Sequence, residues 1–121
     1  MELRYLDFDF SGDAHGHGSF DAMASAGPAQ LAALDAEVRA VLDWAERRFG
    51  PAAPLDEGGE WDYALHGVRE VATPLAVRYA PGADRLEFEA GTPDPARTTL
   101  TLTLSGTDPF CSALREAFGI G

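Results

Sequence analysis

The sequence predicts an α+β fold of two layers: a mainly antiparallel sheet of about five strands, with two helices on one face. Several segments alternate apolar and polar residues, which is typical of antiparallel strands that cover a core with one face. Two other segments repeat apolar residues at steps of three and four, which is the period of an α-helix. Pro and Gly residues separate these segments, and the resulting order is β-α-β-β-β-β-α.

The length and composition favour a single domain over residues 1–121. A chain of 121 residues, of which 45% are hydrophobic and 24% charged, can bury a core of its own. Its length is that of one typical domain. We therefore expect it to fold unaided.

The first strand is predicted at residues 2–10, where apolar and polar residues alternate from Leu6 to Phe10. Leu3 and Tyr5 lie in the opposite phase. Either both faces of the strand are covered at its start, or a bulge lies near Tyr5.

A Gly-rich loop is predicted next, at residues 11–27. This segment, SGDAHGHGSFDAMASAG, holds four Gly and no sustained period. A connection of this length inside a compact domain is usually functional or mobile.

The long helix is predicted at residues 28–49. Apolar residues recur there at steps of three and four from Leu31 to Phe49. Pro28 suits the first turn of a helix, and Gly50 followed by proline ends it.

Three further β segments follow this helix. They are a strand at residues 61–71 with a bulge at His66-Gly67, a hairpin at residues 75–89 with its turn at residues 81–84, and a strand at residues 99–104. Trp61 and Tyr63 alternate with Asp62 and Ala64, so we expect both to face the helix.

A short helix is predicted to end the chain, starting at Asp108-Pro109. A thiol near a helix N-terminus can be reactive. However, Cys111, Leu114 and Phe118 share one helical face, so we expect the thiol to lie in the core.

Two helices on one face leave the other face of the sheet open. The predicted strand phases place nine polar residues there: Asp7, Asp9, Asp62, Arg78, Glu87, Glu89, Thr99, Thr101 and Thr103. This face is net acidic. It is either an ordinary solvated surface or a docking surface.

The charge excludes several classes of partner. Nine Arg and no Lys against twenty Asp and Glu give a formal charge of −11, which is the wrong sign for direct binding of nucleic acid or of an anionic membrane surface. The absence of Lys also excludes Schiff-base chemistry and Walker-type phosphate loops.

The same composition favours a bacterial, cytoplasmic protein. The single cysteine cannot form an intramolecular disulfide. The N-terminus does not have the pattern of a signal peptide, and no apolar run approaches the length of a membrane-spanning helix. The bias towards Ala, Gly, Asp and Arg is typical of GC-rich bacterial genomes.

Residues 7–18 half match the calcium loop of EF-hand proteins. The matching residues are Asp7, Asp9, Ser11 and Gly12. Gly18 occupies the position of the required bidentate carboxylate, and the flanks are predicted as strand. An EF-hand is therefore excluded, while a looser oxygen-ligand site for a hard cation stays open.

The same segment carries the candidate metal ligands His15, His17 and Asp13. Imidazole and carboxylate groups suit zinc or another transition metal. A catalytic zinc usually needs three protein ligands, and the one other histidine is His66 at the predicted bulge. No cofactor is predicted beyond this candidate divalent metal.

These observations lead to two hypotheses of function. The first is a small binding module that docks a protein with a basic surface, through the acidic open face (Asp7, Asp9, Glu87 and Glu89) or through the 11–27 loop (Asp13, His15 and His17). The alternative is a metal-dependent or acid–base enzyme that uses His15, His17 and Asp13. A homodimer also stays open, because unpaired edge strands invite pairing.

Overall fold

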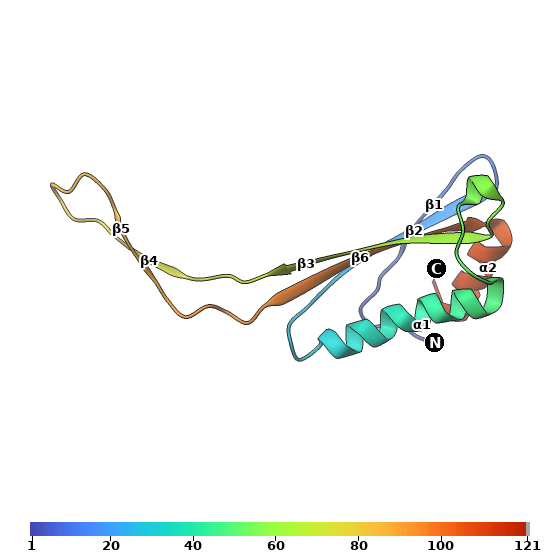
Figure 1. Ribbon diagram of the computed structural model, residues 1–121, viewed down its shortest axis with the longest axis horizontal. Coiled ribbons are helices and arrows are strands. Elements are labelled where there is room, and N and C mark those ends of the chain that lie inside the picture. Colours follow the sequence, from blue (N-terminus) through green and yellow to red (C-terminus); the bar gives the residue numbers. More distant parts are fainter. Residues whose placement is uncertain (121) are drawn as a thin grey trace.

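The computed structural model describes residues 1–120 and confirms the α+β class (Figure 1). Its elements are β1 (Asp9–Gly12), β2 (His17–Ala26), α1 (Leu31–Phe49), the 3₁₀ turn η1 (Leu55–Glu57), β3 (Trp61–Glu70), β4 (Leu75–Arg78), β5 (Glu87–Ala90), β6 (Arg97–Thr107) and α2 (Asp108–Phe118). Neither helix is long and apolar enough to cross a membrane, among the residues described.

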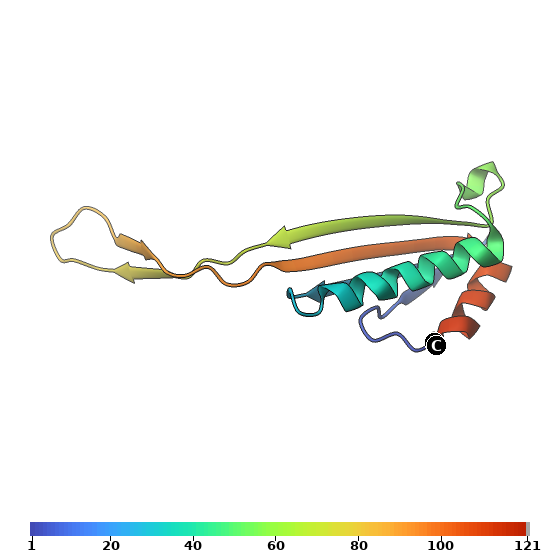
Figure 2. The same cartoon turned by 60° about the horizontal axis from the view of Figure 1, so that its bottom comes forward.

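The strands form two antiparallel sheets. β1, β2, β6 and β3 make a four-stranded sheet in the order β1-β2-β6-β3, while β4 and β5 make a separate two-stranded sheet. Both helices lie on one side of the four-stranded sheet, as predicted (Figure 2). β1 has four residues, so β3 is the long free edge of this sheet.

The prediction of a loop at residues 11–27 is wrong, because most of this segment forms the strand β2. β2 pairs with β1 on one side and with β6 on the other. Its inward residues are Gly18, Phe20, Ala22, Ala24 and Ala26, and all of them are buried. Four of these five residues are Gly or Ala, and the apolar Met23 faces outward, so the alternation of apolar and polar residues is weak.

The strand predicted at residues 2–10 is also wrong over most of its length, since β1 begins only at Asp9. Residues 1–8 are irregular, but Leu6 and Phe8 are buried against α1 and the sheet. A buried carboxylate of α1 holds this segment in place. Glu37 accepts hydrogen bonds from the backbone N–H groups of Arg4, Tyr5 and Leu6, at 2.9 to 3.2 Å.

The bulge predicted at His66-Gly67 is absent. β3 pairs with β6 in one unbroken register, from Trp61 opposite Gly106 to Glu70 opposite Arg97. Trp61 is buried as expected, but Tyr63 is exposed. The helices cover β2 and β6 more fully than they cover the edge strand β3.

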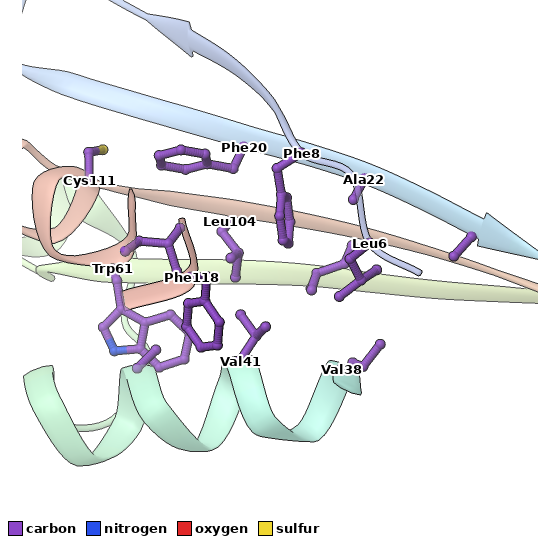
Figure 3. Packing of buried hydrophobic residues seen from close by; sticks show 14 of the residues in the cluster. Leu6, Phe8, Phe20, Ala22, Val38, Val41, Trp61, Leu104, Cys111 and Phe118 are labelled. Atoms are coloured by element: carbon purple, nitrogen blue, oxygen red, sulfur yellow. The ribbon is translucent and has the colours of Figure 1, made fainter. Parts of the chain in front are cut away.

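The core lies between the helices and the inner face of the sheet (Figure 3). At one end of it, the ring of Phe110 on α2 stacks on Trp61 of β3, with centroids 5.8 Å apart and planes 7° apart. Cys111 of the same helix is also buried, as predicted, and its thiol lies 3.6 Å from the carbonyl oxygen of Gly106. Burial raises the pKa of this thiol, which disfavours the reactive thiolate.

Beyond the end of the four-stranded sheet, the chain continues as a projecting arm, residues 71–96. Figures 1 and 2 show this arm as a thin ribbon that extends far past both helices. It contains β4, β5 and the two segments that link them to β3 and β6. The predicted hairpin is thus confirmed, but it lies outside the body of the fold.

Candidate functional site

The open face of the body does carry part of the predicted acidic surface. Asp9 on β1 lies directly opposite Asp21 on β2. Asp21 in turn accepts a hydrogen bond of 2.7 Å from the hydroxyl of Thr103 on β6. Two carboxylates in directly opposed positions repel each other. Asp21 was expected in a loop, so its place beside Asp9 could not be predicted.

Of the other predicted acidic residues, Asp62 lies on the same open face, on β3 opposite Ser105, whereas the remaining three lie elsewhere. Glu87 and Glu89 lie on β5 in the arm, and Figure 1 shows β5 far from β1. Both lie near Arg78 of β4, at 3.7 and 3.8 Å. Asp7 is exposed in the irregular N-terminal segment. The single acidic patch predicted from the strand phases is therefore wrong, because those strands belong to two sheets.

The residues proposed as metal ligands lie at the turn between β1 and β2. Here the Asp13 carboxylate closes the turn by accepting hydrogen bonds from the backbone N–H groups of His15 and His17, at 2.7 and 3.0 Å. These two hydrogen bonds are the main cause of a lowered pKa of Asp13. The carboxylate thus has a structural role in the turn.

His66 does not complete a site with these histidines. His17 pairs with Thr107 at one end of β6, whereas His66 pairs with Thr101. Six residues of strand separate the two positions, which is roughly 20 Å. Among residues 1–120 there is no group of three or more His, Cys, Asp or Glu placed to hold a metal ion.

The role of Asp13 predicts a titration result. Because the folded state favours the carboxylate, the carbon-detected NMR titration of Asp13 should have a midpoint below the ordinary value of 3.8. The turn is then fully stabilised when the pH is above the ordinary pKa of an aspartate, and this stabilisation is lost as the pH falls through the lowered pKa of Asp13. A midpoint at or above 3.8 would contradict this role.

The most unusual surface of the molecule is one that the sequence did not indicate. In the arm, Val77 lies opposite Phe88 and Leu75 lies opposite Ala90, so these four side chains share one face. Tyr79 and Leu86 continue the same alternation. We call these residues the apolar arm face: Leu75, Val77, Tyr79, Leu86, Phe88 and Ala90.

This apolar arm face is open to solvent. The exposed fractions are 55% for Leu75, 53% for Val77, 76% for Tyr79, 46% for Leu86 and 64% for Phe88. None of these side chains belongs to the core cluster or to the residues that pack against it. The opposite face of the same two strands is polar, with Arg78 near Glu87 and Glu89.

The arm is a continuation of the long β3–β6 ribbon. The link from β3 to β4 is two residues shorter than the link from β5 to β6, and the register changes accordingly. Two hydrogen bonds cross the links, from Gly91 N–H to the Pro74 carbonyl and from Asp94 N–H to the Ala72 carbonyl, each 2.8 Å.

A length argument could have revealed the exposed arm. A helix of 19 residues spans about 28 Å, whereas the 18 extended residues from Trp61 to Arg78, which comprise β3, its link and β4, span roughly 60 Å. No single packed helix can cover such a ribbon.

Comparison with protein-family models, with curated proteins and with solved structures finds no match for this chain.

Proposed function

We propose that this protein is a small binding module and that its arm holds a partner polypeptide. The observation that carries the proposal is the apolar arm face, whose five large side chains are each about half exposed or more. Exposed side chains of this size and number present roughly 500 Å² of apolar surface, an amount that on soluble proteins often marks an interaction site.

The weakness of an isolated hairpin supports the same proposal. Two strands without a third strand or a helix against them are marginally stable in water at best. β4 and β5 have only four residues each. A partner that covers the apolar arm face would supply the packing that α1 and α2 supply in the body.

The acidic open face is a second candidate contact. Asp9 and Asp21 lie side by side across β1 and β2, and the polar row of β6 continues from Thr103. A basic side chain from a partner would relieve the repulsion between the two carboxylates. Binding at this face should weaken as the salt concentration rises.

A capture experiment separates the two surfaces. The tagged protein is immobilised and exposed to an extract of the source organism, in its natural form and in three variants. The first is Val77→Thr with Phe88→Thr, which removes the centre of the apolar arm face while threonine keeps the strand propensity. The matched control is Arg78→Thr with Glu87→Thr, the next opposed pair, which lies on the polar face.

The expected result is that the apolar variant captures at least about tenfold less polypeptide than the natural protein, while the matched control captures as much. The third variant, Asp9→Asn with Asp21→Asn, should leave this capture intact. If the apolar variant retains everything that the natural protein retains, the arm is not the binding element. Loss only in the Asp→Asn variant would assign binding to the acidic face instead.

A further inference from the structure

We infer that the partner of the apolar arm face is a second copy of this chain, packed arm against arm. The inference rests on the proposed function, since it names the polypeptide that the arm holds. In this arrangement the apolar face of one arm lies on the apolar face of the other, as two small sheets pack in a β-sandwich. A two-fold axis would relate the two copies.

The area of the apolar arm face fits this arrangement. Each copy presents roughly 500 Å² of apolar surface. Two copies would together bury about 1,000 Å², which is the lower limit for a specific interface. An interface of this size is small, and we therefore expect a reversible dimer with a dissociation constant of about 10 µM.

The chemistry of this face is self-complementary. None of its six residues is charged, so no charge is desolvated, and the one side-chain polar group is the hydroxyl of Tyr79, which sits at the tip of a long side chain that is 76% exposed. Val77 and Phe88 form the central opposed pair. A two-fold axis near this pair brings the same aliphatic and aromatic side chains together from both copies.

The position of the arm also favours contact there. The chain has a formal charge of −11, to which the arm's two arginines and four carboxylates contribute −2. On the polar face, Arg78 lies near Glu87 and Glu89, and its positive charge partly neutralises this face. Because the arm projects far beyond the helices (Figure 2), contact there keeps the two acidic bodies apart.

The sign of the salt dependence distinguishes this partner from a basic one. Salt screens the repulsion between two acidic bodies and does not weaken an apolar contact. Self-association through the arm should therefore persist or strengthen as the salt concentration rises. A complex with a basic protein on the acidic open face would weaken.

Sedimentation velocity of the full chain over a range of concentrations tests the inference. We expect a concentration-dependent dimer at low salt that is retained at high salt. Val77→Thr with Phe88→Thr should raise the dissociation constant about 100-fold. Arg78→Thr with Glu87→Thr, which leaves the net charge unchanged, should change it no more than about twofold. Thermal unfolding of each variant checks that the body is intact.

A cross-linking measurement tests the same contact without a variant that removes the apolar side chains of Val77 and Phe88 together. Val77→Cys places a thiol at the centre of the apolar arm face, and Ala76→Cys places one on the opposite face of the same strand. Both positions are exposed, and Cys111 is buried. Under mild oxidation the Val77→Cys variant should form the covalent dimer at least about tenfold faster than the Ala76→Cys variant.

Three results would overturn the inference: a natural protein that stays monomeric at all concentrations, a dimer that dissociates in high salt, or a dimer that Val77→Thr with Phe88→Thr leaves unchanged. If the protein is monomeric but still captures a different polypeptide through the arm, the proposed function stands and only the second copy is excluded. If the arm variant changes neither dimerisation nor capture, both proposals fail.

Discussion

Replacing Glu37 with alanine is expected to lower the free energy of unfolding by about 3 kcal/mol. The side chain of Glu37 is only 6% exposed, and its carboxylate accepts hydrogen bonds from three successive backbone N–H groups, those of Arg4, Tyr5 and Leu6. Hydrogen bonds to a charged acceptor are stronger than neutral ones, and partly buried donors without an acceptor are costly.

Urea unfolding measures this loss, and amide hydrogen exchange locates it. Residues 4–6 should lose their protection in the Glu37→Ala variant, because no neighbouring strand binds this segment. Glu37→Gln should have an intermediate effect, since it keeps one oxygen acceptor and turns an amide N–H₂ towards the other donors. Glu46→Ala is the matched control, as Glu46 is an exposed glutamate of the same helix. Equal effects at both positions would contradict the role of Glu37.

Replacing Gly106 with alanine is expected to cost about 3 kcal/mol or more. A Cβ atom at Gly106 would overlap the ring of Phe110 and would lie 2.6 Å from its Cγ atom. The ring cannot move aside easily, because Phe110 is fully buried and stacks on Trp61. Gly106 itself lies on the central strand β6, between Gly18 of β2 and Trp61 of β3.

The control for this clash is Gly12→Ala, because a Cβ atom at Gly12 would meet the ring of Phe10 at an ordinary 3.5 Å. That change should cost less than about 1 kcal/mol. Adding Phe110→Leu to Gly106→Ala should destabilise the protein by less than the sum of the two single changes, since the smaller side chain leaves room for the methyl group. Strict additivity in urea unfolding would show that the clash is not the cause.

Elements with strong local signals were predicted correctly from the sequence. α1 ends at Phe49 with Gly50 at φ 83°, as predicted, although it begins at Leu31, three residues after the predicted start, because residues 28–30 form a turn. α2 begins after Thr107 with proline in its first turn. In both cases a glycine or proline determines the backbone conformation of the residues next to it, so the helix boundary depends on local sequence. The predicted hairpin also exists, because alternation and a turn with Pro and Gly are both local features.

Elements with weak local signals were missed. Apart from Phe20, β2 carries only Ala and Gly on its inner face, and it is a strand because β1 and β6 both form backbone hydrogen bonds with it. Residues 2–8 show partial alternation, but they are irregular. The backbone N–H groups of residues 4–6 donate to the carboxylate of Glu37, whereas in a strand they would donate to carbonyl groups of a neighbouring strand. In both segments a distant part of the chain decided the structure.

The candidate site shows the same division. The sequence by itself determined the helices, the hairpin, the acidic charge and which residues of each strand share a face. Only the tertiary structure decided which of those faces are covered, because coverage depends on how far the helices reach along the ribbon. The helices end before β4 and β5, so side chains whose pattern predicts a core strand form an exposed apolar face. For the same reason Glu87 and Glu89, which lie on β5, are far from Asp9.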